Sequence, residues 1–334
     1  MSERLATALD DLRRRWVPDP RLGVFEISLA ADGRLTGAST SRPAVDAVRR
    51  LAADAERRST ITVLPDASIG AGTAAIVTAG AAPLVVEPRA GASRASEALH
   101  GERLRVLERR GAWLRVRAAD GYHAWVHEGY LATGSDEWAE DWGARATAWS
   151  LGAELRFDDG RLRIPLGARV AVRHRGRVEA ADGRIGRISA GVIRSGLEAG
   201  AEARLVAAPE WALRWLGGAP YAWGGRCEWG IDCSGFVQTT YALRGAPLPR
   251  DADLQFGEGH NVPLAADGAG YCAGDLVFFA DNGRVAHVAL WAGAGTVVHA
   301  TLDRGGVATD DLFRDDPPGR RLRASLVGVK RLGS

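Results

Sequence analysis

The sequence predicts a multidomain protein in which two small antiparallel β-barrels precede a C-terminal α+β domain. The chain has 334 residues, enough for two or three domains of ordinary size. Its middle part contains short strand-like runs divided by turn residues, a pattern typical of small barrels. Its C-terminal part combines a helix pattern with a β-hairpin pattern. We therefore expect four regions, at residues 1–65, 66–135, 136–207 and 208–334.

The composition is that of a soluble globular protein, with 25% charged and 46% hydrophobic residues. A formal net charge of +2 gives no basis for a nucleic-acid partner. The uncharged stretch at residues 69–86 is broken by glycines and a proline, so we expect a loop feeding a strand and no membrane partner. The charged N-terminal residues do not resemble a signal peptide, which favours a cytoplasmic location. Three cysteines do not suggest a disulfide framework. No cofactor motif is present, so no cofactor is expected, and the oligomeric state stays open.

Residues 1–65 are expected to be a helical segment that packs on the rest of the chain. One helix is predicted around residues 5–16, and a second at residues 44–57, where apolar side chains recur at helical spacing. The same segment could also form one wall of a ligand groove.

Two stretches predict the barrels. Residues 83–133 carry the runs PLVVEP, ERLRVLER, AWLRVRA and GYHAWVH, divided by turn signals such as Asp120-Gly121. Residues 144–207 contain evenly spaced DDG, PLG and ADG turns. Between them, residues 136–142 are acidic and rich in tryptophan and are predicted to be a linker. A short helix at residues 209–216 leads into the C-terminal domain.

The C-terminal domain is organised around Cys233, within YAWGGRCEWGIDCSGFVQTTYALR at residues 221–244. The residues after Cys233 read as a helix that stops at Gly245, so Cys233 lies at a helix N-terminus. The backbone N–H groups and the helix dipole there favour a thiolate, and a lowered thiol pKa is expected. The alternative is that Cys233 is a small buried hydrophobic residue.

Two downstream histidines favour catalysis over packing. His287 and His299 lie in strand-like runs joined as a hairpin, and a turn centred on Gly293 would place them directly opposite each other. A register slip of two would still leave them on one face. His287 would then take the proton from Cys233, and His299 would fix the tautomer of His287. A zinc site with the same three ligands is the alternative, but no CxxC or HxxxH pair supports it.

At this point a family resemblance emerges. The segments YAWGG, DCSGFVQ, LPRDADLQ, GDLVFF and HVALWAG, followed by the last histidine, resemble the catalytic domain of the NlpC/P60 cysteine peptidases over about residues 206–334. The resemblance implies a papain-like α+β core and cleavage of peptidoglycan stem peptides. It assigns Cys233 as nucleophile, His287 as base and His299 as the third polar residue. Tyr221 matches a tyrosine that helps to stabilise the oxyanion.

The middle of the chain resembles bacterial SH3 domains. The order P, GE-x-L-x-VLE, G-x-W-x-x-V, DGY-x-x-WV and YL covers about fifty residues of such a domain. Residues 144–207 resemble a second, more divergent SH3-like domain, for which a spacer role is expected. Tandem SH3 domains before the catalytic domain are similar to a subgroup of γ-D-glutamyl-L-diamino acid endopeptidases. These enzymes act on free stem peptides whose L-alanine has an unblocked amine, and their first SH3 domain closes the groove.

This resemblance also implies substrate-binding residues. Asp251 matches an aspartate that pairs with the substrate ammonium, and Asp232 and Ser234 match residues that contact the alanyl and γ-glutamyl parts. Trp223 would line the pocket. Arg250 could pair with a substrate carboxylate or be a solvated surface arginine.

The SH3 contribution leaves alternatives open. Tyr122, or otherwise Tyr130, should reach the ammonium, and Glu97 is the one candidate for an acidic group in the loop near residues 90–97. Ordinary barrel packing explains these three residues equally well. Ala252 departs from the serine usual in the family, which puts one hydrogen bond to substrate in doubt.

The expected function is hydrolysis of the γ-D-glutamyl-L-diamino acid bond, in murein peptide recycling or turnover. Two other functions remain open. The chain could be a catalytically silent peptidoglycan-binding module, although it has all three catalytic positions. It could also be a thiol amidase or acyltransferase that uses a different acceptor. The sequence does not indicate which diamino acid is preferred.

Overall fold

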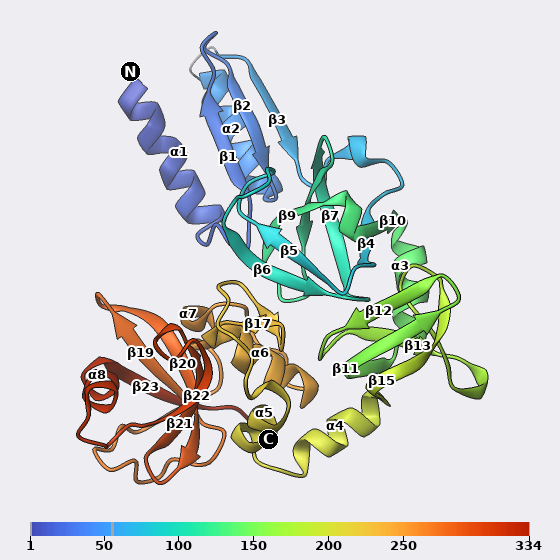
Figure 1. The fold of residues 1–334 in the computed structure, drawn as a ribbon. Helices are drawn as coiled ribbons and strands as arrows, with labels where there is room; N and C mark the ends of the chain where they lie inside the picture. Colours follow the sequence, from blue (N-terminus) through green and yellow to red (C-terminus); the bar gives the residue numbers. More distant parts are fainter. Residues whose placement is uncertain (1, 55–56, 334) are drawn as a thin grey trace.

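The computed structural model describes residues 2–54 and 57–333. Along the chain, a small N-terminal α+β region is followed by two β-rich regions and then by an α+β domain at the C-terminus (Figure 1). The N-terminal and first β-rich regions lie above the C-terminal domain in this view, and the second β-rich region lies to the right of that domain.

The N-terminal region contains a three-stranded sheet besides the two predicted helices. Its elements are α1 (Ser2–Trp16), β1 (Phe25–Leu29), β2 (Leu35–Ser39), α2 (Arg42–Asp54) and β3 (Ser59–Val63). The sheet order is β1-β2-β3, with β2 and β3 parallel across α2. The helices pack on this sheet through a core that includes Leu9, Leu35 and Val48. The prediction of a purely helical segment was therefore wrong. The predicted end of the second helix, beyond Asp54, falls partly on residues 55 and 56, outside the described chain.

The first β-rich region is a seven-stranded sheet in the order β10-β4-β7-β8-β9-β5-β6. The strands are β4 (Ala74–Val77), β5 (Ala81–Val85), β6 (Arg94–Leu99), β7 (Arg103–Arg110), β8 (Trp113–Arg117), β9 (His123–His127) and β10 (Leu131–Gly134). Alternate residues such as Val106, Leu114 and Val126 fill its core. The uncharged stretch at residues 69–86 supplies β4 and β5 rather than one strand.

The second β-rich region begins with a helix where a linker was predicted. Ser135 caps α3 (Asp136–Arg145) by accepting a hydrogen bond from Trp138 N, and Asp136 and Glu137 complement the helix dipole. The other elements are β11 (Ala148–Phe157), β12 (Gly160–Ile164), β13 (Arg169–Val172), β14 (Arg177–Glu179), β15 (Ile185–Ser195) and α4 (Gly196–Arg204). Strand β11 pairs with β12, β13 and β15. The assignment of this region as a second SH3-like barrel stays a prediction.

The C-terminal domain packs helices against a six-stranded antiparallel sheet in the order β18-β23-β19-β20-β21-β22. Its helices are α5 (Ala208–Leu216), α6 (Cys233–Leu243), α7 (Ala252–Gln255) and α8 (Pro317–Ser325). Its strands are β16 (Arg226–Cys227), β17 (Gly230–Ile231), β18 (His260–Val262), β19 (Leu276–Asp281), β20 (Arg284–Gly293), β21 (Thr296–Thr301), β22 (Gly306–Asp311) and β23 (Leu326–Arg331). Phe236 of α6 and Phe278, Leu290 and Val298 of the sheet are fully buried in one core. The predicted α+β architecture of this domain is confirmed.

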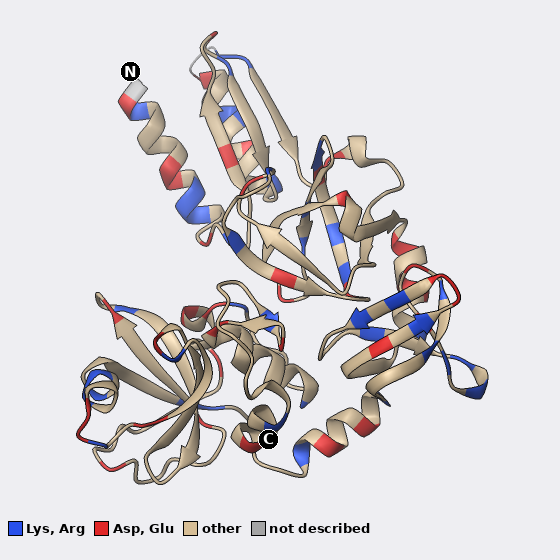
Figure 2. Ribbon diagram, viewed as in Figure 1, with Lys and Arg blue, Asp and Glu red and all other residues tan. Residues whose placement is uncertain are grey.

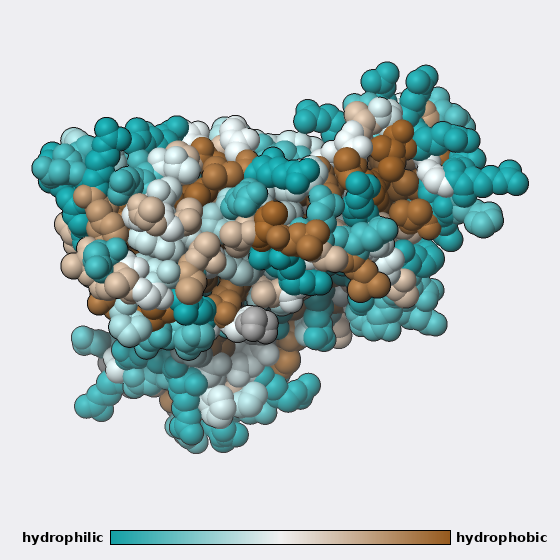
Figure 3. Space-filling view, turned by 90° about the horizontal axis from the view of Figure 1, so that it is seen from below, coloured by the Kyte–Doolittle hydropathy of each residue, from teal (hydrophilic) through white to brown (hydrophobic). Residues whose placement is uncertain are grey.

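The surface carries both signs of charge. Figure 2 shows lysine and arginine interspersed with aspartate and glutamate along the chain. On the face drawn in Figure 3, hydrophobic side chains form separate patches among hydrophilic ones. Within residues 2–54 and 57–333, no helix is both long enough and apolar enough to cross a membrane.

Candidate active site

The structure places Cys233 at the first position of α6, as predicted. Asp232 is the N-cap, and its Oδ1 accepts a hydrogen bond of 2.7 Å from Gly235 N. Two glycines before it allow the loop to pass close to other backbone. Gly224 has a φ of +77°, and a Cβ on Gly225 would lie 2.2 Å from Gly230 O. The loop thus delivers Cys233 to the interface between α6 and the sheet, where 8% of its surface is exposed.

The environment of Cys233 favours the neutral thiol. Burial, followed by the charge of Asp232, raises the pKa of Cys233 to about 11, although backbone N–H groups of Val288 and Ser234 act in the opposite direction. The helix N-terminus was expected to lower the pKa of Cys233. In the folded site this pKa is raised instead, because the desolvation of the thiolate outweighs the helix dipole. Ionisation of this thiol must be coupled to proton transfer to a base.

His287 and His299 form a hydrogen-bonded pair, with 2.7 Å between Nε2 of His287 and Nδ1 of His299. The turn joining β20 and β21 has Ala294 and Gly295 at positive φ, and the strands pair Leu290 with Val298. This register is shifted by two from one centred on Gly293, so the predicted direct opposition of the histidines was wrong. They share a face as diagonal neighbours instead.

A third residue, Asp310 of β22, extends this pair into a relay. Its Oδ2 lies 3.0 Å from Nε2 of His299, and its Oδ1 accepts hydrogen bonds from Arg304. These contacts, the hydrogen bond to His299 first, lower the pKa of Asp310 to about 2. Sequence reasoning missed Asp310, because nothing local distinguishes it within GVATDD.

The relay fixes the tautomer of His287. A carboxylate can only accept, so Nε2 of His299 donates to Asp310, and a ring with one proton then accepts at Nδ1. His287 must then donate from Nε2, which leaves its Nδ1 as a free acceptor. Burial and the neighbouring His299 lower the pKa of His287 to about 3, so the imidazole is neutral at physiological pH. A neutral imidazole with a free nitrogen can act as a base.

Tyr221 lies beside this site. It is half-buried against the core that contains Cys233. Burial, and then the nearby Cys233 and Asp232, raise the pKa of Tyr221 to about 12. The phenol therefore stays protonated and can donate a hydrogen bond.

Arg250 is buried and fully occupied, so neither role considered for it fits. It is 1% exposed, which rules out a solvated surface arginine. Its five N–H donors point to Asp232 through Nη1 and Nη2, to the hydroxyls of Ser96 and Ser234, and to Gly225 O. No donor is left for a substrate carboxylate. Arg250 instead holds Asp232, the N-cap of α6, in place and ties it to Ser96 of β6.

The same contacts change the expectation for Asp232 and Ser234. The Asp232 carboxylate accepts from Arg250 and from the N–H groups of Gly224 and Gly235. The Ser234 hydroxyl accepts from Arg250 at 2.8 Å and lies 3.3 Å from Asp232. Both side chains thus support the loop around Cys233 from within.

Asp251 lies at the junction of three regions of the chain. Its Oδ2 accepts a hydrogen bond of 2.9 Å from Nη1 of Arg21, in the segment between α1 and β1. Tyr122, the residue before β9 in the first β-rich region, lies against the same carboxylate. The pKa of the Tyr122 phenol is raised, first by burial and then by the charge and hydrogen bonding of Asp251. Of the two tyrosine candidates, Tyr122 lies at Asp251, whereas Tyr130 packs on the core of the first β-rich region.

The other predicted residues are divided between the pocket and the domain interface. Trp223 is 70% exposed beside the Cys233 loop, so it is available to a ligand. Ala252 is buried at the start of α7. Glu97 is also buried, and its carboxylate accepts from Arg226 N at 3.2 Å and from the Cys227 thiol at 3.4 Å. Glu97 therefore joins β6 to β16.

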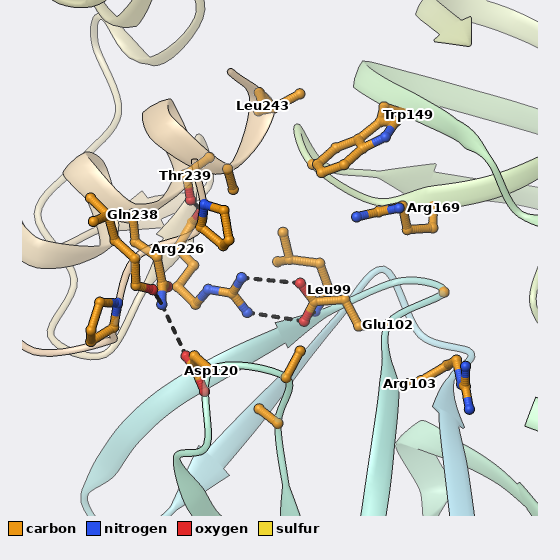
Figure 4. A pocket seen from close by; sticks show the side chains of 18 of the residues that line it. Leu99, Glu102, Arg103, Asp120, Trp149, Arg169, Arg226, Gln238, Thr239 and Leu243 are labelled. Carbon is orange, nitrogen blue, oxygen red and sulfur yellow. Dashed lines mark hydrogen bonds and ion pairs between the residues drawn. The ribbon is translucent and has the colours of Figure 1, made fainter. Parts of the chain in front are cut away.

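A cavity of about 550 Å³ lies where the two β-rich regions meet the other end of α6 (Figure 4). Around it, Arg226 pairs with Glu102 at 2.9 and 3.0 Å, and Gln238 donates to Asp120 at 2.9 Å. Neither Cys233 nor His287 lines it. These contacts fix the first β-rich region on the C-terminal domain.

Among the residues that the structure describes, no group of three His, Cys, Asp or Glu is arranged to hold a metal ion. Instead, a thiol at a helix start faces a sheet that carries a histidine pair and a carboxylate. These are the kinds of group that a cysteine peptidase uses as nucleophile, base and orienting groups.

The comparisons with known proteins identify the family. Residues 218–320 match the NlpC/P60 family model, and residues 84–131 match the bacterial dipeptidyl-peptidase Sh3 domain. The C-terminal domain thus belongs to the NlpC/P60 cysteine peptidase family, and an SH3 domain of that type precedes it.

Among curated proteins, a γ-D-glutamyl-L-lysine dipeptidyl-peptidase of Bacillus subtilis is 42% identical over 86 residues, which are 25% of this chain and 28% of that protein. Its namesake in Bacillus cereus is 41% identical over 86 residues. The matched segments thus span 28% and 25% of these two relatives. A solved NlpC/P60 family protein from Bacillus cereus has a TM-score of 0.59 at 21% identity and covers 77% of this chain and 99% of its own, which shows a shared fold.

Proposed function

We propose that this protein is a cysteine endopeptidase that hydrolyses the γ-D-glutamyl-L-diamino acid bond of peptidoglycan stem peptides with a free N-terminal L-alanine. The hydrogen-bond relay from His287 through His299 to Asp310 is the observation that carries the proposal. It leaves one nitrogen of His287 free to accept a proton, and the Cys233 thiol lies against the backbone N–H of Val288, the residue after His287.

In the proposed reaction, Nδ1 of His287 takes the proton of the Cys233 thiol as Sγ attacks the γ-carbonyl carbon. Proton transfer during attack suits a thiol whose pKa lies well above neutrality. The imidazolium that forms is stabilised by His299 and, through it, by the Asp310 carboxylate. Tyr221 donates to the oxyanion.

His287 then gives its proton to the departing amine of the diamino acid, and a thioester with Cys233 remains. The same imidazole removes a proton from water, which attacks the thioester and releases the thiol. The products are L-alanyl-D-glutamate and a peptide that begins with the diamino acid. Such an activity would serve murein peptide recycling or turnover.

Recognition of the free amine is assigned to Asp251 and Tyr122. An ammonium in a partly closed pocket needs a charge partner, since leaving it unpaired costs several kcal/mol. Asp251 supplies the charge, and the protonated phenol of Tyr122 lies against it. The SH3 domain thereby contributes to the pocket.

The test is mass-spectrometric cleavage of L-Ala-γ-D-Glu-diaminopimelate beside its N-acetylated form. We expect cleavage of the free-amine peptide, loss of cleavage in Cys233→Ala, and retention in Cys272→Ala, which removes an exposed thiol outside the site. Equal cleavage of both peptides would keep the peptidase and reject amine recognition. Failure to cleave either peptide would reject the proposed activity in favour of a binding or acyl-transfer function.

A further inference from the structure

Arg21 brings a cation from the N-terminal region to the proposed amine-binding carboxylate. All five of its N–H donors are used. Nε and Nη2 bind Asp19 at 3.0 and 2.7 Å, and Nη1 and Nη2 each bind Asp253 at 2.7 Å. The remaining bond, from Nη1, goes to Oδ2 of Asp251 at 2.9 Å. Asp251 thus already has a cationic partner within the chain.

The segment that carries Arg21 is fixed to the SH3 domain. The carbonyl of Arg21 accepts a hydrogen bond of 3.0 Å from His123 N of β9. The carbonyl of Leu22 accepts one of 3.0 Å from Arg117 of β8. Arg21 is therefore held beside Asp251 by backbone contacts as well as by its side chain.

We propose that Arg21 is a specificity-determining residue that competes with the substrate ammonium for Asp251. This inference rests on the proposed function. Arg21 has two-point contacts with Asp19 and Asp253 but only one hydrogen bond to Asp251, so an incoming ammonium can replace that bond while Arg21 stays anchored. The substrate ammonium then lies close to the positive charge of Arg21. This repulsion lowers the affinity of the site for the free-amine peptide. Peptides without a free amine do not encounter this repulsion.

The decisive measurement is the ratio of kcat/KM for the free-amine peptide to kcat/KM for its N-acetylated form. Two like unit charges about 4 Å apart repel enough, even at the dielectric constant of water, to change binding about fivefold. Arg21→Gln removes the competing charge, so we expect this ratio to rise at least about fivefold. Arg21→Lys keeps the charge and should stay near the parent ratio.

Arg117→Gln is the matched control, because it loosens the same segment without changing the charge at Asp251. Its ratio should not rise. A ratio that falls or stays constant in Arg21→Gln would overturn the proposal, since a residue that merely orients Asp251 or closes the pocket gives that result. An equal rise in Arg117→Gln would also overturn it, by assigning the effect to loop opening.

A binding experiment separates this inference from the proposed function. Calorimetry measures the affinity of L-alanyl-D-glutamate for Cys233→Ala and for Cys233→Ala/Arg21→Gln, and this measurement needs no turnover. Tighter binding to the double variant, with no change for the acetylated dipeptide, supports competition even if no peptide is cleaved. Absence of binding to both variants, or equal affinity, rejects it.

Discussion

Replacement of Arg250 by methionine tests the role of the buried ion pair beside Cys233. The pair of Arg250 and Asp232 is almost wholly removed from water, with side-chain exposures of 1% and 8%. In Arg250→Met, the long apolar side chain fills much of the same space, but the Asp232 carboxylate loses its charge partner.

The expected cost follows from what Asp232 retains. Removing one partner of a buried ion pair typically costs about 3–5 kcal/mol. Asp232 still accepts hydrogen bonds from the N–H groups of Gly224 and Gly235, so we expect the lower end, about 3 kcal/mol. In Asp232→Asn/Arg250→Met the buried charge is gone, and asparagine remains a good N-cap. More than half of the loss should therefore be recovered.

The assay is urea unfolding of the full chain, monitored by tryptophan fluorescence. The proteins compared are the parent, Arg250→Met, Asp232→Asn and the double variant. The interaction free energy is obtained from the double-mutant cycle. A loss below about 1 kcal/mol in Arg250→Met would contradict the reasoning. So would a double variant that is no more stable than Arg250→Met.

Two further predictions concern the histidine relay. In Asp310→Asn the amide can donate to His299 and reverse both tautomers, so kcat should fall at least about tenfold with little change in KM or circular dichroism. A kcat within twofold of the parent would contradict the relay. His287 has a folded pKa of about 3, below its ordinary 6.5, so the unfolded chain binds its proton first on acidification. The stability that His287 contributes is complete above about pH 6.5 and is lost as the pH falls towards 3. The free energy of unfolding, measured with urea, should be about 1–2 kcal/mol lower at pH 5 than at pH 7 because of His287. This difference should shrink in His287→Asn.

The parts of the site that local patterns determine could be predicted from the sequence. Glycines before Cys233 and apolar spacing after it indicate a loop followed by a helix start, and α6 begins there. The hairpin was also predictable, but its register was not. Ala294 takes a positive φ beside Gly295, and a bulge follows Trp291, so the turn lies beyond Gly293. Such a backbone choice depends on packing against both neighbouring strands.

The parts that depend on distant contacts could not be predicted. Arg21 and Asp251 are 230 positions apart, and no periodicity relates them. Asp310 joins the relay only because β22 pairs with β21. Arg250 was expected to face substrate or solvent, whereas tertiary contacts bury it. By contrast, the helix α3 had a local signal in Ser135 and the acidic residues after it, which the interpretation as a linker overlooked.

The contacts that join the first β-rich region to the C-terminal domain restrict how the C-terminal domain can be inherited. Arg226 binds Glu102 through two nitrogens and the carbonyl of Glu97 through one, while Arg250 reaches Ser96. A gene fragment that encoded only the C-terminal domain would yield two arginines stripped of these partners. Recombination with a foreign SH3 domain would meet the same mismatch. The SH3 domain and the C-terminal domain are therefore expected to move between genomes as one unit. Substitutions on one side of these interdomain contacts should be accompanied by changes on the other side.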